Sequence, residues 1–224
     1  MKIITTHDGS STISLVDGLE HYHSVHGAVT ESRHIFIQAG LNYPLPESGE
    51  LRIFEMGFGT GLNALLTLIE NDSKKNIHYD TIELFPLEDH LVNEMNYPEI
   101  LGRADLRTVF ESLHKSPWNK RCKITDKFNL LKLCGNILLI QLPVEKFHLV
   151  YFDAFAPWFS PECWTIEVFE KVYKAMVPGG VLVTYSSKGE VKRALKTAGF
   201  IVEKLPGPAG KREFVRARKQ ENPC

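Results

Sequence analysis

The chain has 224 residues, of which 43% are hydrophobic and 24% charged, and its formal net charge is −1. At roughly 150 residues per domain, this length predicts one large domain, or one domain with an extension. The composition excludes disordered, collagen-like and repeat proteins. No apolar run approaches the ~20 residues of a membrane span, and the first residues lack the apolar core of a signal peptide. We therefore expect a cytoplasmic protein with no membrane partner.

The first fifty residues are polar and rich in histidine, with short alternating runs such as 12–16. They predict a β-rich N-terminal extension over residues 1–50, followed by a second domain over residues 51–224. From residue 51 the pattern alternates between strands and helices. We expect first a strand at 51–56, a helix at 62–69, a strand at 79–84 and helical structure at 87–113 that is broken near Pro98. A hairpin at 122–133 with a short helix after it follows, and then a strand at 148–152 and a helix at 161–176. The last expected elements are a strand at 181–185, a helix at 190–198, and strands at 200–203 and 213–217.

This alternation predicts an α/β fold with a mostly parallel sheet and helices on both of its faces. Only residues 204–212 separate the last two strands, and this segment is rich in proline and glycine. The sheet is therefore expected to end in an antiparallel C-terminal hairpin.

Basic side chains gather near the C-terminus. Residues 188–219 contain ten Lys or Arg and three acids, a net charge of +7. Such a stretch suits a polyanionic partner. A solvated amphipathic helix and strand would have the same composition, so both interpretations stay open.

Neither the cysteines nor the histidines show the pattern of a metal site. The four cysteines are Cys122, Cys134, Cys163 and Cys224, and no two of them form a CxxC pair. They predict free thiols. Metal ligands need a common focus and a supporting acid or thiol, so we interpret His21, His23 and His26 as a solvated loop and expect no metal.

The strongest local signal is the glycine loop of Gly57, Gly59 and Gly61, which follows a strand and opens a helix. Glycines let a ligand approach the backbone, and the helix N-terminus offers free N–H groups. Dinucleotide loops have the spacing GxGxxG, whereas here the third glycine comes one residue early. Glu55, two residues before the loop, would repel a pyrophosphate and suits a cationic ligand.

S-adenosylmethionine (SAM) fits these features, because it carries a sulfonium, an ammonium and a ribose but no phosphate. We expect Glu55 to face its amino-acid end. Glu83 ends the second strand, 22 residues after Gly61, near the ~20-residue spacing at which an acid meets ribose hydroxyls. One carboxylate can accept both hydroxyls. Taken singly, each signal also fits a tight βα turn with a solvent-facing acid.

Asp153 follows the apolar strand that ends at Phe152, so it should lie at the same edge of the sheet as the glycine loop. Aromatic residues follow it, namely Phe155, Trp158, Phe159 and Trp164. An acid followed by aromatic side chains suits a planar base that presents an amine. The alternative is an aspartate that caps a turn, with the aromatic side chains in the core.

Several motifs occur together, in this order, in one family. They are the segments 55–63, 83–87, 153–157, 161–164 and 211–213, preceded by Tyr22, Ser24, Gly27, Glu31 and Phe36. Over about residues 20–218 the chain resembles the methyltransferase domain of the bifunctional tRNA wobble-uridine enzyme MnmC and its stand-alone form MnmD. The resemblance implies a SAM-dependent methyltransferase fold and methylation of the 5-aminomethyl group of 2-thiouridine at tRNA position 34. The product would be 5-methylaminomethyl-2-thiouridine. The FAD-dependent oxidase of the bifunctional proteins is not expected in this chain.

The resemblance also implies roles for individual residues. The SAM-binding set is Glu55, Gly57, Gly59, Gly61, Asn63, Glu83 and Asn136. The family usually shows Gly-Asp where this chain has Gly135-Asn136, and the Asn carbonyl can still accept a hydrogen bond from the adenine amine. The set expected to bind the tRNA anticodon stem-loop is Tyr22, Ser24, Phe155, Lys211 and Arg212. For Lys211 and Arg212 a contact with phosphate and a charged hairpin tip are both open.

Asp153 is the expected catalytic residue. The acceptor is an alkylamine with a pKa of ~10, and a carboxyl with a pKa of ~4 is a weak base for it. We therefore expect Asp153 mainly to orient the amine and to stabilise the charge that moves from sulfur to nitrogen. Tyr22, Ser24 and Tyr185 are candidate positioning groups.

Two other functions remain possible. An aminopropyltransferase shares this fold and attacks decarboxylated SAM with an amine beside an aspartate. Glu55 and the segment 211–213 favour SAM and tRNA instead. A non-catalytic RNA-binding module is disfavoured by the presence of Glu55, Glu83 and Asp153 together.

Overall fold

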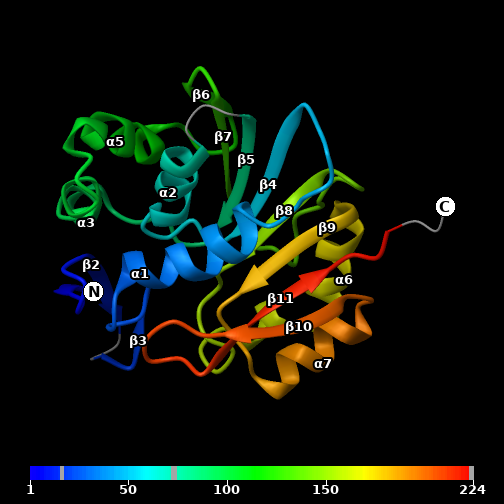
Figure 1. Cartoon of the computed structure of the whole chain (residues 1–224). Coiled ribbons are helices and arrows are strands. Elements are labelled where there is room, and N and C mark those ends of the chain that lie inside the picture. Colours follow the sequence, from blue (N-terminus) through cyan, green and yellow to red (C-terminus); the bar gives the residue numbers. More distant parts are fainter. Residues whose placement is uncertain (16–17, 72–74, 222–224) are drawn as a thin grey trace.

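The computed structural model describes residues 1–15, 18–71 and 75–221. A twisted eight-stranded sheet forms the centre of the protein, in the order β10-β11-β9-β8-β4-β5-β7-β6 (Figure 1). The strands are β4 (Glu50–Met56), β5 (Asn76–Glu83), β6 (Arg121–Thr125), β7 (Phe128–Cys134), β8 (Phe147–Phe152), β9 (Met176–Thr184), β10 (Ile201–Pro206) and β11 (Glu213–Arg218). Parallel pairing joins β9, β8, β4, β5 and β7, whereas β11 is antiparallel to β9 and β10, and β6 to β7. The predicted fold class and C-terminal hairpin are confirmed.

Helices cover both faces of the sheet (Figure 1). One face carries α1 (Ala28–Ser32), the π-helical segment η2 (Arg33–Leu41), α2 (Leu62–Asn71) and α5 (Arg107–Lys115), and the other carries α6 (Ile166–Ala175) and α7 (Gly189–Thr197). Strand β8 is buried along its whole length because it is covered on both sides. Its side chains alternate, so Leu149 and Tyr151 join one core and Val150 and Phe152 the other.

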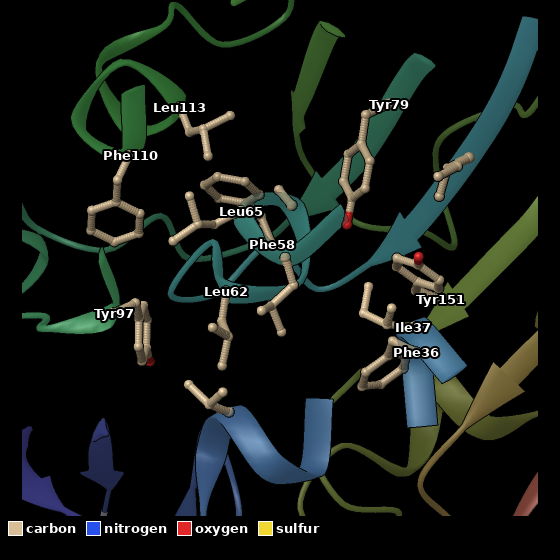
Figure 2. Packing of buried hydrophobic residues seen from close by; sticks show 14 of the residues in the cluster. Phe36, Ile37, Phe58, Leu62, Leu65, Tyr79, Tyr97, Phe110, Leu113 and Tyr151 are labelled. Atoms are coloured by element: carbon tan, nitrogen blue, oxygen red, sulfur yellow. The ribbon is translucent and has the colours of Figure 1, made fainter. Parts of the chain in front are cut away.

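The first core joins the glycine loop to the helices. Figure 2 shows Phe58 and Leu62 packed among side chains from α2, α5 and the sheet. Phe36 of η2 reaches the same core, with its ring centroid 5.3 Å from that of Tyr151 (Figure 2). The loop that follows β4 therefore rests on a packed apolar base.

The N-terminal extension is only partly β-structure. Strands β1 (Lys2–Thr5), β2 (Ser11–Leu15) and β3 (Glu20–His21) form a small antiparallel sheet. The prediction of a β-rich extension is wrong for residues 28–41, which are helical. Ala28, Val29, Ser32, Ile35 and Phe36 are buried, and their spacing is that of one helix face. Polar residues between them hide this period in the sequence.

Two predicted helices are interrupted. Residues 87–113 contain α3 (Asp89–Asn93), α4 (Tyr97–Ile100), η3 (Ala104–Leu106) and the start of α5. The helix predicted at 161–176 divides into η4 (Pro161–Trp164) and α6, and β9 already begins at Met176. Thr165 caps α6, with its Oγ1 accepting the Val168 N–H at 3.4 Å.

The short helix predicted after β7 is a turn instead. The N–H groups of Leu139 and Ile140 both donate to the Asn136 carbonyl, at 3.0 and 3.1 Å. The Lys171 ammonium of α6 donates to the carbonyls of Ile137, Leu138 and Ile140 at 2.6, 2.9 and 3.0 Å. These carbonyls converge on one cation, so the turn is held by α6 and does not continue as a helix.

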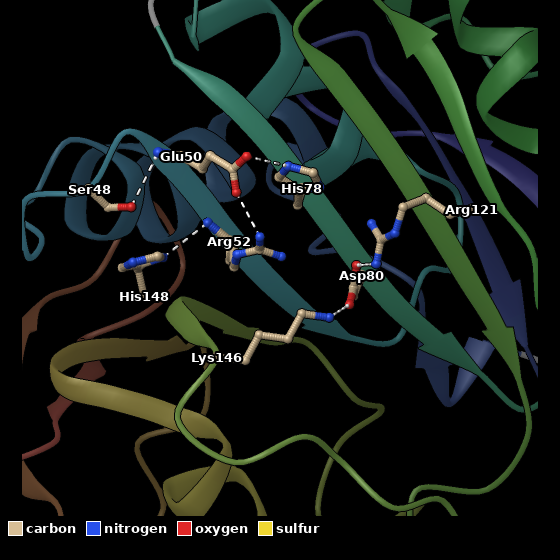
Figure 3. Close-up of polar contacts among 8 residues, drawn as sticks. All are labelled: Ser48, Glu50, Arg52, His78, Asp80, Arg121, Lys146 and His148. Carbon is tan, nitrogen blue, oxygen red and sulfur yellow. Dashed lines mark hydrogen bonds and ion pairs between the residues drawn. The ribbon is translucent and has the colours of Figure 1, made fainter.

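Strand β5 carries a buried acid away from the cavity. The Asp80 side chain is 4% exposed and contacts Arg121 at 2.5 Å and Lys146 at 2.6 Å (Figure 3). We expect Asp80→Ala to lower the free energy of unfolding by about 1–3 kcal/mol, less than for a fully buried pair because both cations can rehydrate. Urea unfolding would measure it. Glu50→Ala, which breaks the more exposed pairs with Arg52 and His78 (Figure 3), should lower it less, because water screens such pairs. Equal losses in the free energy of unfolding for Asp80→Ala and Glu50→Ala would contradict the stronger contribution that we expect of the buried ion pairs.

The described residues contain no helix long and apolar enough to cross a membrane. Within the same residues, no cluster of His, Cys, Asp and Glu is arranged to hold a metal ion. Cys122, Cys134 and Cys163 are free thiols, and Cys224 lies outside the described residues.

Candidate active site

A cavity of about 510 Å³ opens at the carboxyl ends of β4, β5, β8 and β9. The chain leaves β4 toward β5 and β7 on one side and later returns to β8 and β9 on the other. Ligands of open α/β sheets bind at such a switch point. The wall is completed by residues 20–25, the turn after β7, the loop after β8 and the side chains of Tyr185 and Lys211.

The glycine loop connects the three central strands. Gly57 has φ 90°, and a Cβ there would lie 2.6 Å from the Asp153 carbonyl oxygen, so only glycine fits. The Gly57 N–H donates to the Ile82 carbonyl at 3.0 Å, and the Asp153 N–H donates to the Met56 carbonyl at 2.9 Å. These bonds fix the positions of the residues that follow β4, β5 and β8.

Glu83 both supports this loop and lines the cavity. Its Oε2 accepts the Gly59 N–H at 3.0 Å, and its Oε1 accepts the Phe85 N–H at 2.9 Å. Burial raises the pKa of the Glu83 carboxyl, and the backbone N–H groups partly offset that rise. Each carboxylate oxygen has a further lone pair, so Glu83 can accept two more donors from the cavity.

Asp153 lines the cavity beside Asn63, whose Nδ2 donates to Asp153 Oδ2 at 2.8 Å. Burial raises the pKa of the Asp153 carboxyl to about 7, and the Glu31 carboxylate adds to the rise. The Asn63 amide and the Lys211 ammonium oppose it. The expectation of a weak base with an ordinary pKa is therefore corrected, because the side chain is desolvated. A carboxyl of this kind can accept a proton near neutral pH.

Glu55 and Gly61 do not line the cavity. Glu55 is fully buried behind the wall, and neither of its carboxyl oxygens makes a hydrogen bond of normal geometry. Burial raises the pKa of Glu55 well above its ordinary value. Gly61 faces α5, where a Cβ would lie 2.7 Å from His114 Nε2. The contacts with SAM expected of both residues stay predictions.

Tyr22, Ser24 and Phe155 also line the cavity, and a Cβ at Gly59 of the glycine loop would lie 3.0 Å from the Tyr22 ring. The Tyr22 and Phe155 rings meet edge to face, with centroids 4.9 Å apart. Ser24 Oγ accepts the His26 N–H at 3.2 Å. In the loop after β8, Trp158 is 54% exposed whereas Trp164 is buried, so that loop divides between surface and core.

Lys211 and Arg212 are separated by the structure. Lys211 lines the cavity and forms an ion pair with Glu31, while the exposed Arg212 side chain lies outside the lining. Arg212 is the more exposed of the two and stays the candidate for the predicted phosphate contact. Asn136 lines the cavity, and its Oδ1 already accepts the Leu138 N–H at 2.9 Å.

The sequence alone indicates no role for Glu31 or Lys171. Glu31 belongs to the N-terminal resemblance, but its ion pair joins distant parts of the chain and has no local pattern. Lys171 is a lysine on an amphipathic helix, where a solvated side chain is the usual expectation.

Comparison with known proteins gives a consistent family. A family model described as S-adenosyl-L-methionine-dependent methyltransferase matches residues 106–220. The bifunctional protein MnmC of tRNA 5-methylaminomethyl-2-thiouridine biosynthesis is 32% identical in Ectopseudomonas mendocina, over 91% of this chain and 33% of that protein. The Burkholderia mallei protein of the same name is also 32% identical, over 90% of this chain and 34% of its own length. The chain thus spans about a third of these relatives.

Solved structures of methyltransferases have the same fold as this chain. The crystal structure of MNMC2 from Aquifex aeolicus superposes with a TM-score of 0.77 and 27% identity, over 99% of this chain and 70% of that one. A methyltransferase from Pyrococcus furiosus, at 17% identity and a TM-score of 0.51 over 92% of this chain and 88% of its own, shares the fold.

Proposed function

The chain belongs to this family of SAM-dependent methyltransferases, and we propose that it methylates the 5-aminomethyl group of 2-thiouridine at position 34 of tRNA. The product is 5-methylaminomethyl-2-thiouridine, and the anticodon stem-loop is the part of the tRNA that binds. The observation that carries the proposal is Asp153, a carboxyl with a raised pKa in the same cavity as the glycine loop. The MnmC relatives, named for the biosynthesis of this nucleoside, support the choice of acceptor.

The residues of the cavity fit SAM. Gly57 leaves the space that a Cβ would fill, and Glu83 has lone pairs free for the ribose hydroxyls. Asn63 and Asn136 also line the cavity, and we assign Asn63 to the amino-acid end of SAM and Asn136 to the adenine. When bound, SAM supplies a methyl group on a sulfonium, an electrophile that an amine attacks directly.

The acceptor amine is protonated at neutral pH and must lose a proton before it reacts. Asp153 is the residue that accepts this proton. A proton moving from an alkylammonium of pKa ~10 to a carboxyl of pKa ~4 climbs about 8 kcal/mol. With the pKa of Asp153 near 7, the climb is about 4 kcal/mol. The Asn63 amide keeps the carboxylate in one orientation. Loss of this proton leaves the nitrogen neutral, with the lone pair that would accept the methyl group of bound SAM.

We further propose that residues 1–50 act as an extension of the methyltransferase domain at 51–224. Tyr22, Ser24 and Glu31 from this extension line the same cavity as the glycine loop and Asp153 of the domain. This shared cavity supports the proposal that both parts contribute to one site.

Mass spectrometry of tRNA nucleosides tests this function. Purified protein, SAM and tRNA bearing 5-aminomethyl-2-thiouridine should yield 5-methylaminomethyl-2-thiouridine. Decarboxylated SAM with a polyamine should give no product, which separates this activity from aminopropyl transfer. Binding of the tRNA without methylation would instead identify a non-catalytic RNA-binding module.

Arg212 should contribute to tRNA binding through phosphate. We expect Arg212→Ala to reduce the slope of log affinity against log salt by about 0.7, the value for one single-strand phosphate contact. Lys211→Met should change the slope little, because Lys211 faces the cavity and already pairs with Glu31. Fluorescence anisotropy at several salt concentrations measures both. An unaltered slope for Arg212→Ala would place that side chain outside the tRNA interface.

A further inference from the structure

The acceptor side of the cavity contains an ion pair that the mechanism above does not use. Glu31 of α1 is 7% exposed, and it pairs with Lys211 in the loop between β10 and β11, whose side chain is 26% exposed. Glu31 Oε2 accepts the Ser24 N–H at 2.9 Å. Both side chains line the cavity.

This pair is connected to the surroundings of Asp153. The Lys211 ammonium lies 4.2 Å from the ring centroid of Tyr185, and the Tyr185 hydroxyl donates to the Ala154 carbonyl at 2.8 Å. Ala154 is the residue next to Asp153. The ion pair and the proposed proton acceptor therefore face one cavity from different elements.

Glu31 has capacity for another donor. Among the described residues its Oε1 contacts only the Lys211 ammonium, and a carboxylate oxygen has a second lone pair for another donor. A buried carboxylate requires a compensating cation. Lys211 supplies that charge through a flexible four-carbon stem, and a second ammonium entering the cavity could supply it equally well.

We propose that Glu31 is a second substrate-binding carboxylate, which holds the cationic acceptor amine opposite Asp153, and that Lys211 is its counter-ion until the amine arrives. The inference rests on the proposed function and specifies the chemistry that the acceptor side recognises, a primary alkylammonium. Exchange of one ammonium for another leaves no uncompensated charge at Glu31. The acceptor then lies beside Asp153, which takes its proton.

The charges around Asp153 fix the direction of the expected pH effects. The groups that face or adjoin it are Asn63 of α2, Glu55 of β4, Tyr79 of β5, Tyr185 after β9, Glu31 of α1 and Lys211. Among them, the Glu31 carboxylate raises the pKa of Asp153 and the Lys211 ammonium lowers it. Removing one partner should therefore move this pKa in the opposite direction from removing the other.

Steady-state methylation of the aminomethylated tRNA between about pH 6 and about pH 9 tests the inference with Glu31→Gln and Lys211→Met. Gln keeps the shape and can accept the Ser24 N–H. We expect Glu31→Gln to raise the KM for tRNA by about tenfold to a hundredfold, the effect of one charge-assisted hydrogen bond, and to lower the acidic midpoint of kcat/KM. Lys211→Met should raise that midpoint. Glu31→Asp should restore part of the tRNA affinity.

Two controls separate the possible failures. SAM affinity by calorimetry should match the wild type in both variants, which also reports that they fold. Glu170→Gln, which removes an exposed carboxylate of α6 outside the cavity wall, should leave the KM for tRNA unchanged. An active wild type with unchanged KM and midpoint in Glu31→Gln would overturn the inference and leave the proposed function intact. A wild type that transfers no methyl group would overturn the proposed function and the inference together.

Discussion

Replacing Asp153 with asparagine is expected to lower kcat by at least about a hundredfold at saturating tRNA. Asparagine keeps the shape of the side chain but can neither accept the amine proton nor stabilise the charge that develops on nitrogen. SAM affinity should stay near the wild-type value, because the asparagine side chain keeps an oxygen that can accept the Asn63 amide. Single-turnover methylation and calorimetry measure the two quantities. Near-normal turnover would show that Asp153 is structural.

The dependence of methylation activity on pH gives a second test of Asp153. In the wild type, activity should rise with pH as Asp153 loses its proton, with a midpoint near its pKa of about 7. The rise is in this direction because the deprotonated carboxylate is the reactive form. The residual activity of Asp153→Asn should not show this rise with pH.

Replacing Glu83 with alanine should weaken SAM binding by roughly 2–4 kcal/mol, or about thirtyfold to a thousandfold. The variant loses both proposed bonds to the ribose hydroxyls and also the acceptor that holds Gly59 N–H. Titration calorimetry measures the affinity, and circular dichroism should show an intact fold because Glu83 ends its strand. Glu83→Gln, which keeps the shape and an acceptor, should lose less. Unchanged affinity in Glu83→Ala would remove this residue from the cofactor site.

The central strands and the residues at their carboxyl ends were predictable because their signals are local. An apolar strand followed directly by Gly57 or Asp153 can be recognised from a few consecutive residues, and it predicts that these residues lie at the carboxyl end of a strand. The helix at 28–41 was missed because polar residues interrupt its apolar face. Contacts such as that between Glu31 and Lys211 join the two ends of the chain, and no short window contains both partners.

Glu55 shows a burial that its charge did not lead us to expect. The period of two along β4 puts Glu55 on the same side as Ile53, which is in the core. The charge of the side chain led us to expect a ligand contact, whereas strand geometry already indicated an inward direction. Asp153 shows the reverse, since its position was expected and its altered pKa needed the three-dimensional surroundings.

The wall around the glycine loop joins residues up to 97 positions apart, such as Met56 and Asp153, whereas the ion pair of Glu31 with Lys211 joins residues 180 positions apart. Closing so long a segment costs more chain entropy than closing a shorter one. A refolding molecule should therefore form the wall around the glycine loop first and the wall that contains Glu31 and Lys211 last.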